Sequence, residues 1–200
     1  HAAETLANAA GGVPEFESPW ALLVLVPYLG AFAIYGLGHV STRARDIGAV
    51  ILAVATLALV VFDGNLDPAS RVFALVFAGI TAVMVVYSIG YMARAEWTNR
   101  YYFFAFLMIG SLLGLTTAHE MGNFYVYWEL MTWTSYFLVI HEQTQKSLRA
   151  GLIYFMMCAS GAYLMHFGIL LTHAEIGSFE FATLAEKVGT ISPLAGLVIA

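Results

Sequence analysis

Long apolar runs alternate with short polar segments along most of this chain. A helix needs about 20 apolar residues to cross a bilayer core, with a range of about 17 to 25. Six runs reach or approach this length, at residues 20–40, 47–62, 72–93, 101–118, 124–140 and 150–171, and a seventh starts at Ile191. The pattern predicts an all-α, polytopic transmembrane helical bundle of six spans plus the start of a seventh, as part of a longer chain.

The composition excludes a soluble domain. Of the 200 residues, 60% are hydrophobic and 10% are charged, whereas about a quarter are charged in soluble proteins. We therefore divide the chain into a polar N-terminal segment, residues 1–19, and a transmembrane domain, residues 20–200. The N-terminal segment lacks the basic region of a secretory signal peptide.

The positive charges predict an orientation in the membrane. Six of the eight Lys and Arg residues fall in the segments 41–46, 94–100 and 141–149, which share one side of the bilayer when the spans alternate. The opposite side holds Arg71 and Lys187. Because loops rich in Lys and Arg stay in the cytoplasm, we expect these three loops to be cytoplasmic and the N-terminus to lie outside.

Residues 178–189, between the sixth and seventh runs, have a pattern of their own. The apolar positions that recur at i, i+3, i+4 and i+7 are Phe181, Leu184, Ala185 and Val188. Ser178 can cap the start of a helix there, and Gly189 can end it. The segment predicts a short amphipathic helix on the membrane surface; a plain ordered loop is the alternative.

The fifth run, NFYVYWELMTWTSYFLVI, contains one acid, Glu129, about 5 Å along the helix axis from the middle of the run. A charge near the bilayer centre costs roughly 2.5–3.5 kcal/mol on insertion scales, so such residues are usually functional. Tyr125, Thr132 and Tyr136 lie on the same stripe of the helix, which must face protein or water. Asn123 is the expected N-cap of this helix.

A carboxyl group in such a setting keeps its proton when alone and releases it when a cation approaches. This behaviour suits a proton relay, and we take Glu129 as the candidate proton-carrying switch. The alternative is a permanently protonated Glu that only holds the bundle together. His166 in the sixth run and Lys146 before it are further candidates for a relay, although a lone His usually packs and a basic residue at a cytoplasmic helix end follows from topology alone.

The stretch WELMTWTSYFLV resembles the helix-5 signature of the antiporter-like subunits shared by respiratory complex I, Mrp-type sodium/proton antiporters and energy-converting membrane hydrogenases. YSIGYM, RYYFFAFLMIGSLLGLTTA and IGSFEFATLAEK resemble the end of helix 3, helix 4 and the loop after helix 6 of that family. The similarity covers roughly residues 70 to 190, and WELM is more similar to the hydrogenase-type members than to those of complex I.

The resemblance implies that Glu129 pairs with a Lys on a broken helix 7, and that their coupling changes with proton uptake and release. That Lys is expected beyond Ala200, as is a second, inverted repeat. Several complex I relatives have a further acid in helix 6, but CASGAYLMH has none here, so that role is not transferred.

We therefore expect a proton-translocating or Na⁺-translocating, antiporter-like subunit of a membrane-bound redox complex related to NADH:quinone oxidoreductase and energy-converting hydrogenases. A subunit of a Mrp-type Na⁺/H⁺ antiporter without redox partners is the first alternative, and a structural membrane anchor is the second. We expect no cofactor in this chain, with iron–sulfur clusters and a quinone or hydrogenase metal centre in partner subunits. The expected partners are other membrane and peripheral subunits, the lipid bilayer and H⁺ or Na⁺, not nucleic acid, in a bacterial or archaeal cytoplasmic membrane.

Overall fold

The computed structural model describes residues 20–187, and its side chains from Leu22 onward. This part of the chain is all-helical, apart from one isolated bridge between Glu120 and Glu180. The helices are α2 (Trp20–Val40), α3 (Thr42–Phe62), α4 (Pro68–Tyr91), the short 3-10 helix η1 (Met92–Arg94), α5 (Thr98–Thr116), α6 (Met121–Val139), α7 (Gln145–Ile176) and α8 (Phe181–Lys187).

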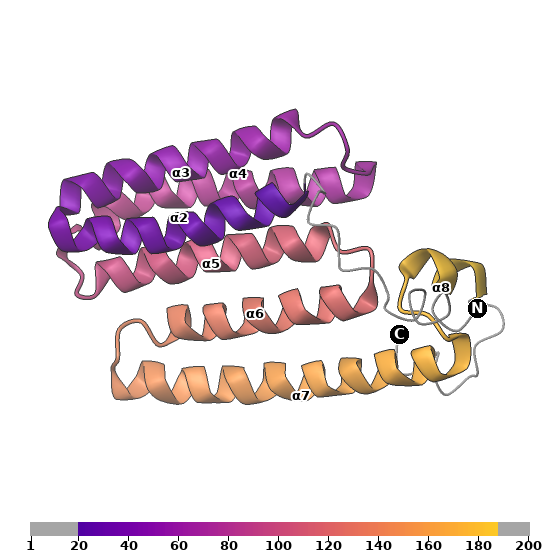
Figure 1. Ribbon diagram of the computed structural model, residues 1–200. Coiled ribbons are helices and arrows are strands. Elements are labelled where there is room, and N and C mark those ends of the chain that lie inside the picture. Colours follow the sequence, from indigo (N-terminus) through magenta and orange to yellow (C-terminus); the bar gives the residue numbers. More distant parts are fainter. Residues whose placement is uncertain (1–19, 188–200) are drawn as a thin grey trace, which may run out of the picture.

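The long helices run up and down beside one another (Figure 1). α2, α3, α4 and α5 form a four-helix group, in which α5 packs against both α2 and α4. α6 then packs on α5, and α7 packs on α6, so these two helices extend the group on one side. The main apolar core lies within α2–α5 and includes Phe106, Ile109 and Leu113 of α5.

Polar residues at the helix starts explain why several helices are longer than the apolar runs. The Ser41 hydroxyl accepts a hydrogen bond from the Ala44 N–H at 3.4 Å, so α3 begins at Thr42. The Asp67 carboxylate accepts from the N–H groups of Ala69 and Ser70 at 3.1 and 3.0 Å, ahead of Pro68. Side-chain capping of this kind satisfies N–H groups that have no partner inside the helix.

Two predicted caps are wrong. α6 begins at Met121 with Glu120 as its N-cap, which makes no side-chain capping bond, so Asn123 lies inside the first turn. The backbone explains this early start, because the Met121 N–H donates to the Phe179 carbonyl at 2.9 Å. Ser178 accepts from the Glu180 N–H at 3.2 Å and therefore forms a turn before α8 rather than its cap.

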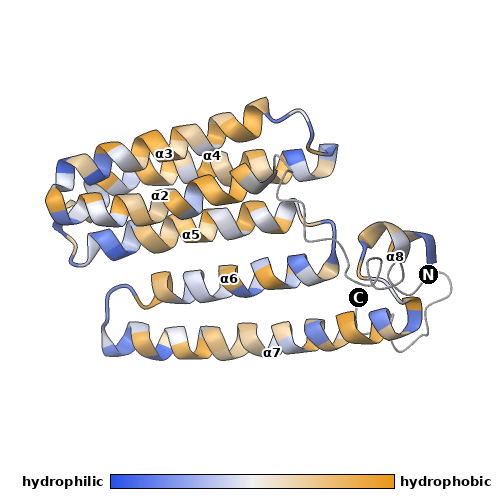
Figure 2. Ribbon diagram, in the orientation of Figure 1, coloured by the Kyte–Doolittle hydropathy of each residue, from blue (hydrophilic) through white to orange (hydrophobic). Residues whose placement is uncertain are grey.

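Four helices are long and apolar enough to cross a membrane, judged by length and composition: Leu22–Val40, Thr42–Phe62, Pro68–Arg94 and Gln145–Ile176. α5 and α6, with 19 residues each, are not among these four. α5 begins with Thr, Asn and Arg, and α6 mixes Glu129 with Thr, Ser, Tyr and Trp, which Figure 2 shows as paler and bluer turns. Six spans are thus not confirmed, and the seventh run from Ile191 lies outside the described residues.

The two ends of the bundle differ in charge. The connections around residues 41, 92–97 and 140–144 gather at one end, on the left in Figure 1, and we call this the basic end. Arg45, predicted to be a loop residue, belongs to the first turn of α3, and its side chain is only 8% exposed. A single residue, Ser41, separates α2 from α3, so the predicted loop 41–46 is wrong.

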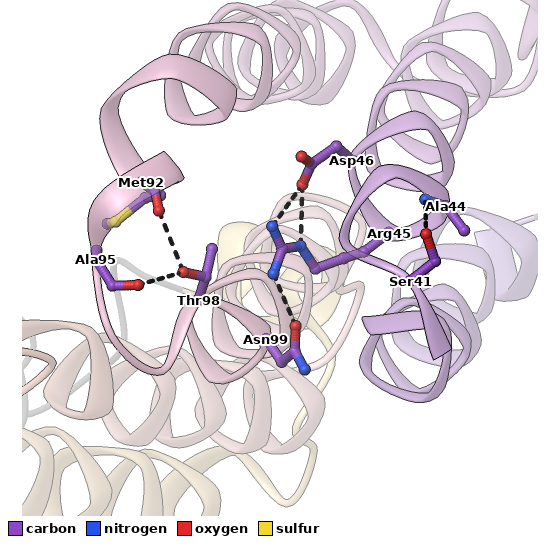
Figure 3. Close-up of polar contacts among 8 residues, drawn as sticks. All are labelled: Ser41, Ala44, Arg45, Asp46, Met92, Ala95, Thr98 and Asn99. Carbon is purple, nitrogen blue, oxygen red and sulfur yellow. Dashed lines mark hydrogen bonds and ion pairs between the residues drawn. The ribbon is translucent and has the colours of Figure 1, made fainter. Parts of the chain in front are cut away.

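Arg45 ties α3 to α5 at the basic end (Figure 3). Its Nε and Nη2 donate to one oxygen of Asp46 at 2.9 and 2.8 Å, and its Nη1 donates to the Asn99 side-chain oxygen at 2.8 Å. The guanidinium also lies 5.3 Å from the centre of the Tyr102 ring. A buried cation is tolerated only with partners of this kind.

Close contacts set the position of α6 between its neighbours. A Cβ on Gly114 of α5 would lie 2.5 Å from the Tyr127 ring of α6, so the glycine makes room for that ring. Phe104 of α5 and Phe137 of α6 stack with ring centres 4.4 Å apart. On the other side, Gly151 of α7 admits Ile140 at the end of α6. Small residues let membrane helices approach closely in this way.

Candidate functional site

Glu129 is the ninth of the 19 residues of α6, one position before the middle of the helix, and its side chain is half-buried. The Tyr125 hydroxyl donates a hydrogen bond to Glu129 Oε1 at 2.9 Å. The two residues are four apart on one helix, a spacing that puts side chains on the same face. The helix itself therefore positions this pair.

The ring of His166, from α7, packs against Tyr125. The two ring centres are 4.6 Å apart, with 38° between the ring planes. His166 also remains exposed in the described part of the chain. Three groups that can exchange protons, a carboxyl, a phenol and an imidazole, thus meet across the α6–α7 interface.

The structure does not bring the other predicted residues together with Glu129 in the same way. Thr132 is 2% exposed and lies one turn from Glu129 along α6. Tyr136 packs its ring against Phe137 and Phe155, with ring centres 5.4 and 5.3 Å apart. Lys146 is exposed in the first turn of α7 at the basic end.

Sequence reasoning missed one polar contact of this interface. Ser135 Oγ on α6 and Tyr154 OH on α7 are 2.7 Å apart. Ser135 could have been found, since it belongs to the quoted stretch WELMTWTSYFLV, but nothing in the sequence links it to Tyr154. Within residues 20–187, no group of three or more His, Cys, Asp or Glu side chains could hold a metal ion.

A second histidine lies at the basic end, where Arg100 Nη2 donates to the backbone oxygen of His141 at 2.8 Å. Burial and the neighbouring Arg100 guanidinium hold the pKa of His141 below its ordinary value, while Glu142 and a backbone hydrogen bond with Glu96 act in the opposite direction. Its neutral form is therefore favoured in the folded protein.

Two family models match the chain. The one described as NADH-ubiquinone oxidoreductase (complex I), chain 5 N-terminus, matches residues 50–103. The one described as NADH:quinone oxidoreductase/Mrp antiporter, TM, matches residues 118–198 and so includes α6 and α7.

Similar proteins include the Na⁺/H⁺ antiporter subunit A1 of Staphylococcus aureus strains JH9 and Newman, each 27% identical over 131 residues. These 131 residues are 65% of this chain and 16% of the relative, so the chain spans a small part of the relatives' length.

The fold is similar to that of a chain in the membrane-bound sulfane sulfur reductase, an archaeal respiratory membrane complex, with a TM-score of 0.79 and 19% identity. That match covers 90% of this chain and 42% of the other. The family models confirm the resemblance carried by the stretch around Glu129, and the similar fold agrees with it. The chain belongs to the antiporter-like membrane subunits of the superfamily that includes complex I and the Mrp antiporters.

Proposed function

We propose that this integral membrane protein translocates protons, with Glu129 as the group that takes up and releases them. The observation that carries the proposal is the position of Glu129, in the middle of α6 and hydrogen-bonded to Tyr125 at 2.9 Å. Tyr125 also contacts His166, so the carboxyl group is linked to a second proton-exchanging side chain on α7.

The proposal includes an arrangement in the membrane. α5 and α6, with 19 residues each, are roughly 28 Å long, which fits a hydrocarbon core of about 30 Å. They lie beside the four apolar helices as members of one up-and-down bundle. In this arrangement all six long helices cross the bilayer, and the basic end faces the cytoplasm.

A carboxyl group acts as a switch when its surroundings change its proton affinity. The desolvated environment of a bundle favours the neutral acid, and a cation that moves close favours the carboxylate. The hydroxyl of Tyr125 stabilises the carboxylate by donating to it, but it has no charge with which to drive proton release. The proposal therefore requires a basic side chain that approaches Glu129 and withdraws from it.

Two assemblies are compatible with this role. A redox-driven complex is supported by the fold similarity to a subunit of the sulfane sulfur reductase complex. A Mrp-type Na⁺/H⁺ antiporter is supported by the relatives named antiporter subunit A1. Co-purification of iron–sulfur subunits with the tagged chain would favour the redox complex, and Na⁺-dependent proton exchange without them would favour the antiporter.

The test of the proton role is a pumping measurement in vesicles that hold the assembled complex. Glu129→Gln keeps the size and hydrogen bonding of the side chain, but the amide group cannot take up and release a proton. Its matched control is Glu142→Gln, which removes an exposed acid from the connection between the same two helices. We expect Glu129→Gln to abolish pumping at normal assembly and Glu142→Gln to retain it.

Normal pumping by Glu129→Gln would contradict the proposal and favour a structural anchor, in which this acid is a hydrogen-bonded packing residue. Equal loss in both variants would show that removing any acid from this hairpin disturbs the complex. That result, too, would count against a specific role for Glu129.

A further inference from the structure

Polar side chains continue from Glu129 toward the basic end of α6. Thr132 follows Glu129 by three residues, and Ser135 follows Thr132 by three. Residues three apart are neighbours on a helix surface, and each step of three rises roughly 4.5 Å. The three side chains therefore form a continuous polar spiral of roughly 9 Å along the axis.

The last residue of this spiral, Ser135, contacts α7. Ser135 Oγ lies 2.7 Å from Tyr154 OH, and the same Oγ donates to the Thr132 carbonyl at 2.9 Å. Thr132, in the middle of the spiral, is 2% exposed. Hydroxyl groups are thus found at each step between Tyr154 and Glu129.

A packing role alone is the competing explanation, because two other helix pairs are joined by a Ser–Tyr contact. Tyr28 of α2 and Ser111 of α5 are 2.9 Å apart, and Ser88 of α4 and Tyr101 of α5 are 2.8 Å apart. Neither pair lies on α6 or α7. Of these three contacts in the described residues, the Ser135–Tyr154 contact is the one with a member, Ser135, on the same helix as Glu129, and the polar side chain of Thr132 lies between Ser135 and Glu129 along that helix.

We propose that Tyr154, Ser135 and Thr132 form a hydroxyl pathway that conducts protons to and from Glu129 on the side of α6 that leads to the basic end. The inference rests on the proposed function, because it requires Glu129 to exchange protons. It adds a route and two positioning residues, Ser135 and Tyr154.

The pathway conducts with the help of water. A hydroxyl group accepts one hydrogen bond and donates another, so each member takes a proton from one neighbour and passes its own to the next. Ser135 does so after its hydroxyl group rotates away from the Thr132 carbonyl, to which it donates in the structure. The charge of each hydroxyl group is then unchanged after one transfer. The proposal requires a water molecule on either side of the Thr132 hydroxyl, because Ser135 bonds to the backbone carbonyl of Thr132 and Glu129 bonds to Tyr125. The transferred proton leaves water at the basic end and arrives on the Glu129 carboxylate.

The test compares Ser135→Ala and Tyr154→Phe with Ser111→Ala and Tyr28→Phe in the assembled complex in vesicles. The second pair of variants removes an interhelical Ser–Tyr contact of similar length from α2 and α5, and so measures the cost of losing such a contact. Proton pumping, its solvent deuterium isotope effect and the amount of assembled complex are measured for each. Ser135→Thr, which keeps a hydroxyl group, is the rescue variant.

We expect Ser135→Ala and Tyr154→Phe to slow pumping about tenfold, since a positioned proton-transfer group contributes more than this and water replaces it in part. Their isotope effect should rise, because proton transfer then limits the rate. Ser135→Thr should pump near the wild-type rate, and the α2–α5 variants should keep both the wild-type rate and the wild-type isotope effect.

Two results would overturn the pathway. If Ser135→Ala and Tyr154→Phe pump like the α2–α5 variants while Glu129→Gln is inactive, the pathway is wrong and the proposed function stands. The pathway is equally wrong if they reduce the amount of complex without changing the isotope effect, since the pair is then structural. If Glu129→Gln pumps normally, the proposed function fails, and the pathway fails with it.

Discussion

Replacement of Arg45 by Met should destabilise the protein far more than the same replacement of Arg43. The two arginines are two residues apart in the first turn of α3, and each contributes one positive charge to the basic end. Arg43 is exposed, whereas the Arg45 side chain is 8% exposed and bonded to Asp46 and Asn99. The comparison of the two variants therefore measures what the buried contacts of Arg45 contribute to stability, apart from the effect of losing one positive charge at the basic end.

The expected difference follows from the contacts. Removing one partner of a buried ion pair costs about 3–5 kcal/mol, because the other charge remains buried without a partner. The remaining carboxylate, Asp46, is 22% exposed, so water solvates part of it and we expect a value near the lower limit, about 3 kcal/mol. Arg43→Met should change the stability by less than about 0.5 kcal/mol, as exposed substitutions usually do.

The measurement is the free energy of unfolding of the purified full-length protein in mixed micelles with increasing SDS. A third variant, Arg45→Met with Asp46→Leu, removes both charges and should recover most of the lost stability, since no unpaired charge is left. Equal values for Arg45→Met and Arg43→Met would refute the reasoning, as would a double variant no more stable than the single one.

Three more predictions concern packing, capping and pH. Gly114→Ala should cost about 1–3 kcal/mol because its Cβ would overlap the Tyr127 ring, whereas Gly79→Ala, which meets nothing within 4 Å, should raise or maintain stability in the same unfolding assay. Asp67→Ala should cost about 1 kcal/mol through loss of the α4 cap, and Asp67→Asn much less, since Asn also caps well. The pKa of His141 is lowered from 6.5 in the folded protein, so its contribution to stability is complete above about pH 6.5 and is lost as the pH falls below that value. The thermal midpoint should thus decline less between pH 7.5 and 5 in His141→Gln than in the wild type; equal declines would show that another group is responsible.

The sequence by itself determined the features that depend on one helix at a time. Run lengths and the spacing of positive charges predicted long helices with basic connections at one end. The structure has the long helices, but it places most of these basic residues at or near the starts of α3, α5 and α7 rather than in the connections. The contact between Tyr125 and Glu129 also followed from sequence, because a spacing of four residues fixes two side chains on one face of any α-helix. Helix starts were less predictable, since Ser41 and the Met121–Phe179 backbone bond extend α3 and α6 beyond their apolar runs.

Only the tertiary structure decided which side chains meet across two helices. The contact of His166 with Tyr125, the Ser135–Tyr154 pair and the burial of Arg45 depend on how each helix is rotated and shifted against its neighbour. A soluble helix reveals its rotation through one apolar stripe. Membrane helices are apolar on most sides, so hydrophobicity does not select the buried face, and close packing around residues such as Gly114 selects it instead.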